Sequence, residues 1–254
     1  VENPVYKPVL SLGYGPLNYI GDVNNSLNYP VTGNQAVMFS VSTFIDNRHT
    51  TTANFFFHLG RLTGNHYSVQ DVERNLNFST SLYSIGATAR YGFGHFIPES
   101  FLLHPYVSLG IENINFSTKG DLEDASGNIY HYWDDGTIRD RSPSDPGEAV
   151  ILHRDYVYET DMRSYERNTY GLGNYNQRTI GIPMEIGVML HLSDRVFLSM
   201  GTAYHMAFTD YIDNVAAEGT SIQGAKGNDG YLFSHATLHF DLFSDPETRT
   251  VELM

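Results

Sequence analysis

The chain has 254 residues, no cysteine and a net charge of −14 at pH 7. The absence of cysteine excludes a disulfide framework and a thiolate metal site, and the negative charge argues against nucleic acid as a partner. No run of about 18 apolar residues occurs, which excludes a membrane-spanning α-helix.

Eight segments along the chain are predicted to be β-strands, because apolar and small or polar residues alternate in them with a period of two. Between 180 and 190, for example, every even-numbered residue is Ile, Met, Val or Leu. Each segment is at least as long as a tilted strand that crosses a membrane, which needs about 9–11 residues. The predicted strands are 8–20, 35–46, 53–66, 77–94, 104–117, 178–191, 195–211 and 230–243.

The connections between these strands alternate between longer, polar segments and shorter ones. In chain order they are 21–34, 47–52, 67–76, 95–103, 118–177, 192–195 and 212–229. Alternate connections lie at opposite ends of an antiparallel barrel, so this alternation places long loops outside the cell and short turns in the periplasm.

The two faces of the strands indicate which side of the barrel meets lipid. One face is apolar, and the other carries Gly, Ser, Ala and Thr with an occasional charge. The three lysines, Lys7, Lys119 and Lys226, all fall outside the predicted strands. A soluble lipid-pocket barrel shows the same alternation but needs an exterior rich in Lys and Glu. The sequence therefore predicts an all-β, eight-stranded antiparallel transmembrane β-barrel of the outer membrane, with the apolar face outward.

Several segments resemble small OmpA-like outer-membrane β-barrels of the Bacteroidota type. The resemblance is carried by 181–187 (GIPMEIG), 192–196 (LSDRV) and 208–213 (FTDYID). The last strand, 235–243 (HATLHFDLF), resembles the C-terminal insertion signal of such barrels, although Ala236 or Thr237 stands where Gly is usual. The resemblance implies a structural or adhesive protein, in some members followed by a periplasmic domain that binds peptidoglycan.

The domain organisation follows from these elements. Residues 1–245 are expected to form one barrel, with the long extracellular loop 118–177. Residues 246–254 read as a linker towards a further periplasmic domain, through which peptidoglycan would become a partner. A signal peptide is expected to have been removed ahead of residue 1, or the chain is a piece of a longer one.

Charged and histidine residues on the small, polar face are the first candidate site. A β-turn near residue 101 would place Arg90 opposite Glu112, and Glu185 lies at a similar height. The interpretation is one polar layer inside the barrel that fills it as a plug, since eight strands leave room only for side chains; a gated pore is the alternative. The predicted members are Arg90, Glu112, Glu185, His58, His205 and His235.

The loop 118–177 is the second candidate site, because a long loop without structure of its own is uncommon unless it is functional or disordered. It carries the only tryptophan and several residue types that are enriched in binding hot spots. The alternative is a ribbon that merely extends the neighbouring strands, and calcium binding by its Asp and Glu residues does not match the usual loop spacing. The candidate contacts for a protein partner are Tyr130, Tyr132, Trp133, Arg139, Arg141, Tyr156 and Tyr158.

Catalysis is not expected. The Gly-x-Ser-x-Gly, His-Glu-x-x-His and phosphate-loop motifs do not occur, and the neighbours Ser234 and His235 point to opposite faces of their strand. The predicted function is a non-enzymatic anchor or docking component of an envelope or cell-surface assembly, without cofactor or metal. The other partner expected is outer-membrane lipid or lipopolysaccharide. A narrow solute channel and an outer-membrane hydrolase are the alternatives.

Overall fold

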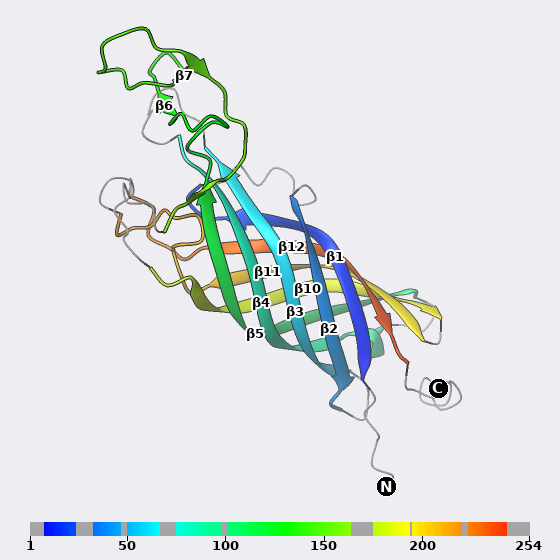
Figure 1. Ribbon diagram of the computed structural model, residues 1–254. Coiled ribbons are helices and arrows are strands. Elements are labelled where there is room, and N and C mark those ends of the chain that lie inside the picture. Colours follow the sequence, from blue (N-terminus) through cyan, green and yellow to red (C-terminus); the bar gives the residue numbers. More distant parts are fainter. Residues whose placement is uncertain are drawn as a thin grey trace.

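The computed structural model describes residues 8–23, 33–46, 50–66, 75–97, 101–163, 175–193, 195–219 and 223–242. Eight long strands form an antiparallel barrel (Figure 1), which confirms the predicted fold class. Each predicted strand is present, with ends that differ by a few residues. The strands are β1 (Val9–Ile20), β2 (Asn34–Phe44), β3 (Thr51–Asn65), β4 (Asn77–Gly92), β5 (Leu103–Gly120), β10 (Arg178–Ser193), β11 (Val196–Ala207) and β12 (Gly230–Phe240).

The barrel closes on itself through the first and last strands. Leu12 of β1 lies opposite Phe39 of β2 on one side and opposite Leu238 of β12 on the other. β10 bridges the remaining gap by pairing with both β5 and β11. Closure leaves no strand edge of the barrel unpaired, which is the condition for a β-sheet to cross hydrocarbon.

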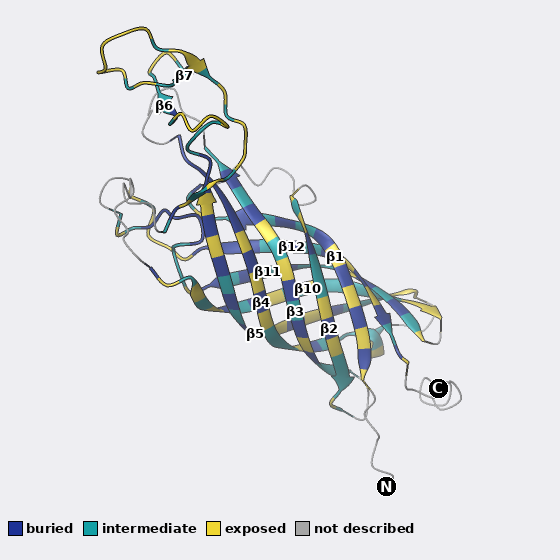
Figure 2. Ribbon diagram, in the orientation of Figure 1, coloured by how far each residue is buried: buried dark blue, intermediate teal, exposed yellow. Residues whose placement is uncertain are grey.

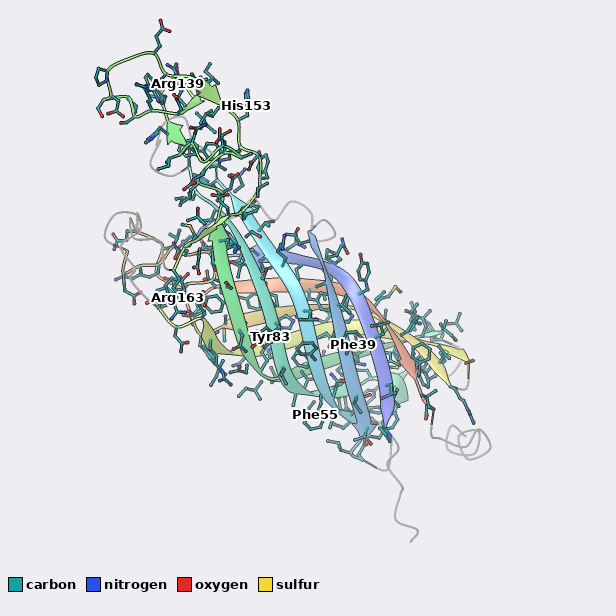
Figure 3. The ribbon with its side chains drawn as sticks, in the orientation of Figure 1. Phe39, Phe55, Tyr83, Arg139, His153 and Arg163 are labelled. Carbon is teal, nitrogen blue, oxygen red and sulfur yellow. The ribbon has the colours of Figure 1, made fainter. Side chains whose placement is uncertain are left out.

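The outer face of the barrel is apolar and exposed. Ile186 is 71 % exposed, Phe55 64 % and Ile111 59 %, whereas Ser199 and His58, on the inner face, are fully buried. Exposed bands cross the outside of the strands in Figure 2, and Phe39, Phe55 and Tyr83 lie on that side in Figure 3. A surface of this kind requires hydrocarbon around it, so the eight strands span a membrane, and the architecture is that of an outer-membrane barrel.

The described residues contain no α-helix that is long and apolar enough to cross a membrane. A 3-10 turn (Gly94–Phe96) lies in the short connection between β4 and β5.

The extracellular half of the interior is an apolar core, which the alternation in the sequence did not predict. Inward-facing Leu17, Leu62, Phe78 and Ile114 are at most 2 % exposed. Loop residues pack onto them from above, among them Val23, Ile212 and Val215. The small, polar inner face is therefore restricted to the middle and the periplasmic half of the barrel.

The expectation that no lysine lies on a strand is wrong for Lys119. β5 continues to Gly120, because the short strand β9 (Thr160–Asp161) pairs with its end and places Asp161 opposite Lys119. The long connection therefore begins at residue 121 rather than 118. The predicted linker 246–254 lies outside the described residues.

Residues 121–163, which we call the flap, rise above the extracellular end of the barrel (Figure 1). Three short strands form a small sheet within it: β6 (His131–Tyr132), β7 (Ile138–Arg139) and β8 (Ile151–Leu152). The order β6-β7-β8 makes β8 an edge strand. The flap is thus a folded extension of the hairpin between β5 and β10.

Candidate functional site

The register between β4 and β5 differs from the one predicted. Arg90 lies opposite Ser108, and Glu112 lies opposite Gly86, so the predicted pairing of Arg90 with Glu112 is wrong. The connection is centred near residue 99 rather than 101, which shifts the two strands by four residues relative to each other. Because the shift is an even number, Arg90 and Glu112 both still face inward.

The first interior cluster is built around Glu185. Ser108 of β5 pairs with Arg90 of β4 on one side and with Glu185 of β10 on the other. The two charged residues therefore lie at the same height in the barrel, two strands apart. Arg90 Nη2 lies 3.6 Å from Glu185 Oε1, and both side chains are about one tenth exposed. His235 Nε2 lies 3.1 Å from the same carboxylate oxygen. The Glu185 carboxylate thus lies between the Arg90 guanidinium and the His235 ring.

Tyr106 completes this Glu185 cluster, and the sequence analysis did not single it out. Its hydroxyl donates to Glu185 Oε1 at 2.5 Å, and its ring lies 4.2 Å below the Arg90 guanidinium. A Cβ on Gly187 would stand 2.5 Å from the Tyr106 hydroxyl, so the glycine makes room for the ring. Tyr106, like Ser108 and Glu112, has an even number on β5 and therefore faces inward. This alternation in the sequence could have identified Tyr106 as a member of the interior.

The second interior cluster is built around Glu112, nearer the extracellular end. His205 Nδ1 lies 2.7 Å from Glu112 Oε1. The Tyr231 ring stacks on the His205 ring with 4.4 Å between the ring centroids. The His58 ring also stacks on the His205 ring, with 5.6 Å between the centroids. The six predicted residues therefore form two clusters instead of a single layer: Glu185 joins Arg90 and His235, and Glu112 joins His205 and His58.

A hydrogen-bonded chain of Ser11, His239 and Ser199 lies near the periplasmic end. Ser11 Oγ is 2.7 Å from His239 Nδ1, and Ser199 Oγ is 2.8 Å from His239 Nε2. All three side chains are buried on the inner wall. The contact resembles the start of a hydrolytic dyad, but both ring nitrogens are occupied by serines and the group faces away from lipid.

The extracellular mouth is closed by the connection between β11 and β12. The Ile212 carbonyl accepts hydrogen bonds from the Thr80 and Thr118 hydroxyls at 2.5 and 2.8 Å. Ile212, Val215 and Ala216 are at most 1 % exposed. This loop is therefore inserted into the barrel as part of its core.

Two buried carboxylates hold the mouth loop in place. Asp213 accepts hydrogen bonds from the Val23 and Val215 amides, both at 2.9 Å. Asp229 accepts from the Ile212 amide at 2.7 Å and from the Tyr19 hydroxyl. Burial raises the pKa of Asp213 to about 7, and burial together with the neighbouring Asp213 raises the pKa of Asp229. The docked loop therefore favours protonated carboxyl groups.

The flap is braced against the barrel rim by Arg154. Its guanidinium donates to the Asn75 carbonyl at 3.1 Å and to the Asn65 side chain, and both residues belong to the β3–β4 end. Arg154 Nε also donates to the Tyr132 hydroxyl at 2.7 Å. These bonds fix the base of the flap relative to the barrel.

The predicted contact residues of this loop have different environments. Tyr130 is buried at the flap base, where its hydroxyl donates to the His153 carbonyl, so it is not a surface contact. Trp133 is half-buried below Arg139, whose guanidinium lies 3.9 Å from the indole. Tyr132 and Tyr158 are half-buried, whereas Arg141 and Tyr156 are exposed.

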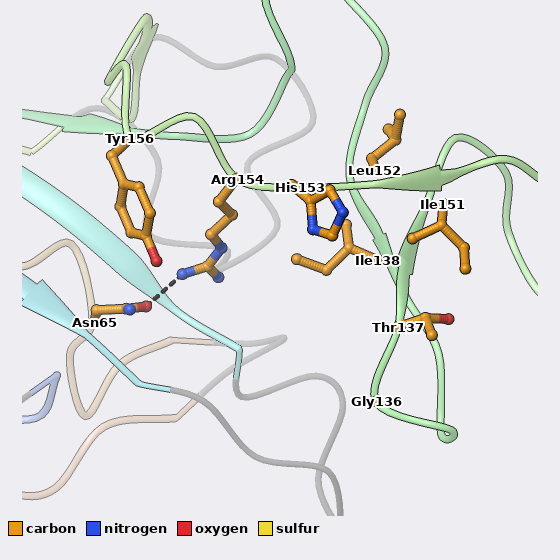
Figure 4. Close-up of a pocket in the computed structure, with 9 residues that line it drawn as sticks. All are labelled: Asn65, Gly136, Thr137, Ile138, Ile151, Leu152, His153, Arg154 and Tyr156. Atoms are coloured by element: carbon orange, nitrogen blue, oxygen red, sulfur yellow. Dashed lines mark hydrogen bonds between the residues drawn. The ribbon is translucent and has the colours of Figure 1, made fainter.

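A groove of about 500 Å³ separates the flap sheet from the rim of the barrel (Figure 4). Ile138, Ile151 and Leu152 line one side, and Arg154 with Asn65 lines the other. Exposed apolar side chains lie in the groove and next to it: Ile151 in its lining is 55 % exposed and Tyr156 60 %, and the adjoining Val150 and Val157 are 61 % and 60 % exposed. These residues were not predicted individually, except for Tyr156.

The acidic residues of the flap serve its own turns. Asp124 accepts hydrogen bonds from the Ser126 and Asn128 amides, and the Asn128 side chain holds the pKa of Asp124 below its ordinary value. Asp135 accepts hydrogen bonds from the Thr137 amide and from the Arg139 guanidinium. Their oxygens are thus occupied by neighbours within the loop, as expected for turn residues.

No family model and no curated protein matches this chain. Solved structures with a similar architecture include the Neisserial surface protein A (11 % identity, TM-score 0.48, 92 % of this chain and 97 % of that one). A major outer membrane protein from Thermus thermophilus has 10 % identity and a TM-score of 0.46, over 93 % and 98 % of the two chains. OprG from Pseudomonas aeruginosa has 7 % identity and a TM-score of 0.41, over 92 % and 95 %. At such values the likeness says nothing about function.

Proposed function

We propose that this outer-membrane barrel is a non-enzymatic anchor, and that the flap docks a partner at the cell surface. The observation that carries the proposal is the flap itself, which is folded and braced by Arg154 while it leaves an apolar run beside a groove. Loop residues that served only as a cap would gain nothing from exposing Val150, Ile151 and Val157 to water.

The interior supports an anchor rather than a channel. The Glu185 and Glu112 clusters fill the polar part of the barrel, and the Ile212 loop closes its extracellular end. Eight strands leave an interior just wide enough for such side chains. We expect no single-channel conductance from the purified chain in planar bilayers, and steady openings would refute the anchor.

The inner wall also argues against a hydrolase. The Ser11–His239–Ser199 chain is buried, and among the residues that the structure describes no carboxylate is hydrogen-bonded to it. Substrate lipid would have to enter a filled barrel to reach it. Turnover of phospholipid or lipopolysaccharide acyl chains by the purified chain, abolished in Ser11→Ala, would overturn this part of the proposal.

The docking role is tested by binding of the reconstituted full chain to cell envelopes of its source. We expect saturable binding that Ile151→Asp abolishes, because a carboxylate would enter the apolar side of the groove. Glu148→Gln, also exposed on the flap, is the matched control and should bind as the unchanged chain does. Equal binding by both variants would exclude the groove as the docking surface.

Two finer assignments belong to the same proposal. The first is membership of the OmpA-like barrels of Bacteroidota-type bacteria, which depends on the segments quoted above. The second is a periplasmic extension after the barrel with peptidoglycan as its partner. Both would be tested on the full-length gene product, by its sequence and by its sedimentation with isolated peptidoglycan.

A further inference from the structure

The outward-facing positions of the eight barrel strands carry three charged side chains, and all three are cations. They are Arg61 on β3, Lys119 on β5 and Arg178 on β10, each exposed. The remaining outward positions are apolar, small or uncharged polar residues. In a chain with a net charge of −14, chance alone would favour carboxylates at these positions.

The three cations share one end of the barrel. Arg178 is the first residue of β10, and Lys119 is the last but one of β5, so both lie at the extracellular end of their strands. Arg61 lies four residues from the same end of β3. Apolar outward residues such as Leu59, Ile111 and Ile180 follow towards the periplasm. Charges on the lipid face are tolerated near the interface and not at the bilayer centre.

The strand register brings the cations into one sector of the barrel wall. Arg61 lies opposite Ser81, which lies opposite Ser117, two residues from Lys119. Arg178 lies opposite Asn115 on the next strand. At strand spacings of about 4.8 Å the group spans roughly 15 Å. We call it the cationic patch: Arg61, Lys119 and Arg178, with Ser81, Asn115 and Ser117 between them.

The charges of this patch are not neutralised within the described part of the chain. None of the three cations forms an ion pair with a described carboxylate; Arg178 Nε donates to the neutral Asn113 side chain at 3.0 Å. Asp161 lies opposite Lys119 across the β5–β9 pair and offsets one charge. The sector therefore keeps a net positive charge near the extracellular end of the outer face.

We propose that the cationic patch binds the phosphate of an anionic lipid headgroup in the outer leaflet. Arginine matches phosphate with parallel N–H donors, and the serine and asparagine side chains supply further donors to the sugar or phosphate oxygens. This inference goes beyond the docking role of the flap, because it needs only the orientation of the barrel. It gives the lipid partner a defined site on β3, β4, β5 and β10.

The test is native mass spectrometry of the full chain in detergent, with bisphosphorylated lipid A as the probe. The comparison lipid is phosphatidylethanolamine, whose phosphate is balanced by its own ammonium group, so that the headgroup has no net charge. A cation near an anionic headgroup contributes about fivefold in affinity. We therefore expect Arg61→Gln/Lys119→Gln/Arg178→Gln to bind lipid A at least ~10-fold more weakly. The control is Arg195→Gln, which removes one positive charge from the turn at the periplasmic end and should leave lipid A binding unchanged; the single variant Arg178→Gln is its match in charge and should weaken binding.

Heat-modifiable migration in gels shows whether each variant has folded. If the triple variant does not fold, Arg61→Gln/Lys119→Gln with Arg178 retained gives the same comparison. Arg61→Lys/Arg178→Lys keeps both positive charges and should retain most of the lipid A binding that the glutamine variants lose. Lipid A binding that is equal in the unchanged chain and the glutamine variants would overturn the proposal. Binding of phosphatidylethanolamine as strong as that of lipid A would overturn it as well.

Discussion

Glu185 neutralises the only buried guanidinium of the barrel interior that the structure describes, so its removal should destabilise the barrel strongly. In Glu185→Gln the shape is kept, but Arg90 loses its counter-charge while its side chain stays about 10 % exposed. Breaking a buried ion pair on one side costs about 3–5 kcal/mol. The Tyr106 hydroxyl and the His235 ring must also share a weaker acceptor, which adds about 1 kcal/mol.

The complementary change should cost less. In Arg90→Met the carboxylate keeps its bonds from Tyr106 and His235, so we expect a loss of about 2 kcal/mol. The double variant removes both charges, and its loss should fall short of the sum of the single losses by about 2 kcal/mol, the size of a strong coupling between neighbours. Exposed Glu148→Gln is the control, with a change within about 0.5 kcal/mol.

The assay is urea unfolding of the chain in lipid vesicles, followed by far-UV circular dichroism. Fluorescence is unsuitable, because the single tryptophan, Trp133, lies in the flap and reports on that element. If Glu185→Gln and the control unfold at the same urea concentration, the ion pair contributes nothing. If the double variant loses as much free energy of unfolding as the two single variants together, Arg90 and Glu185 act separately.

Three further predictions concern the flap, the mouth and the outer face. Arg154→Ala should raise the rate of proteolysis within 121–163 while the urea midpoint of the barrel stays unchanged; an unaltered cleavage rate would mean that the rim contacts do not brace the flap. The raised pKa of Asp213 means that the docked mouth loop holds a proton, so docking is strongest below the ordinary pKa of 3.8 and weakens as the pH rises through about 7. Protection of the Ile212 amide, which is the intrinsic exchange rate divided by the observed rate, should therefore fall as the pH rises from 5 to 8, and Asp213→Asn should reduce this fall; a fall in protection that Asp213→Asn leaves unchanged contradicts the assignment. Ile186→Arg should cost about 2–4 kcal/mol in vesicles, because it places a charge on the lipid face, and a neutral outcome in the same urea titration would argue against hydrocarbon at that position.

The strands and their faces could be predicted because a period of two is a local property of the sequence. The alternation along 180–190 fixes which side chains point outward whatever the neighbouring strand is, and the structure agrees. Loop lengths were sufficient to place the two ends of the barrel. The composition of the strand faces was sufficient to place lipid outside.

The register and the loop packing could not be predicted in the same way. The pairing of Arg90 depends on how the connection 93–102 folds, and the 3-10 turn at Gly94–Phe96 shifts its centre. The core under Ile212 depends on a loop that folds back into the barrel, for which periodicity gives no signal. Tyr106 was on the predicted inner face, but only the three-dimensional row of Arg90, Ser108 and Glu185 shows that its hydroxyl reaches the carboxylate.

The most direct test of the account is the environment of single spin labels on the outer face. Because the chain has no cysteine, Ile186→Cys, Leu238→Cys and Glu148→Cys each give one labelling site without further changes. In lipid vesicles we predict that labels at 186 and 238 relax with oxygen and not with a water-soluble nickel chelate, and that the label at 148 does the reverse. Nickel access at 186 and 238 equal to that at 148, in a chain that stays monodisperse without detergent, would contradict an apolar exterior in the membrane.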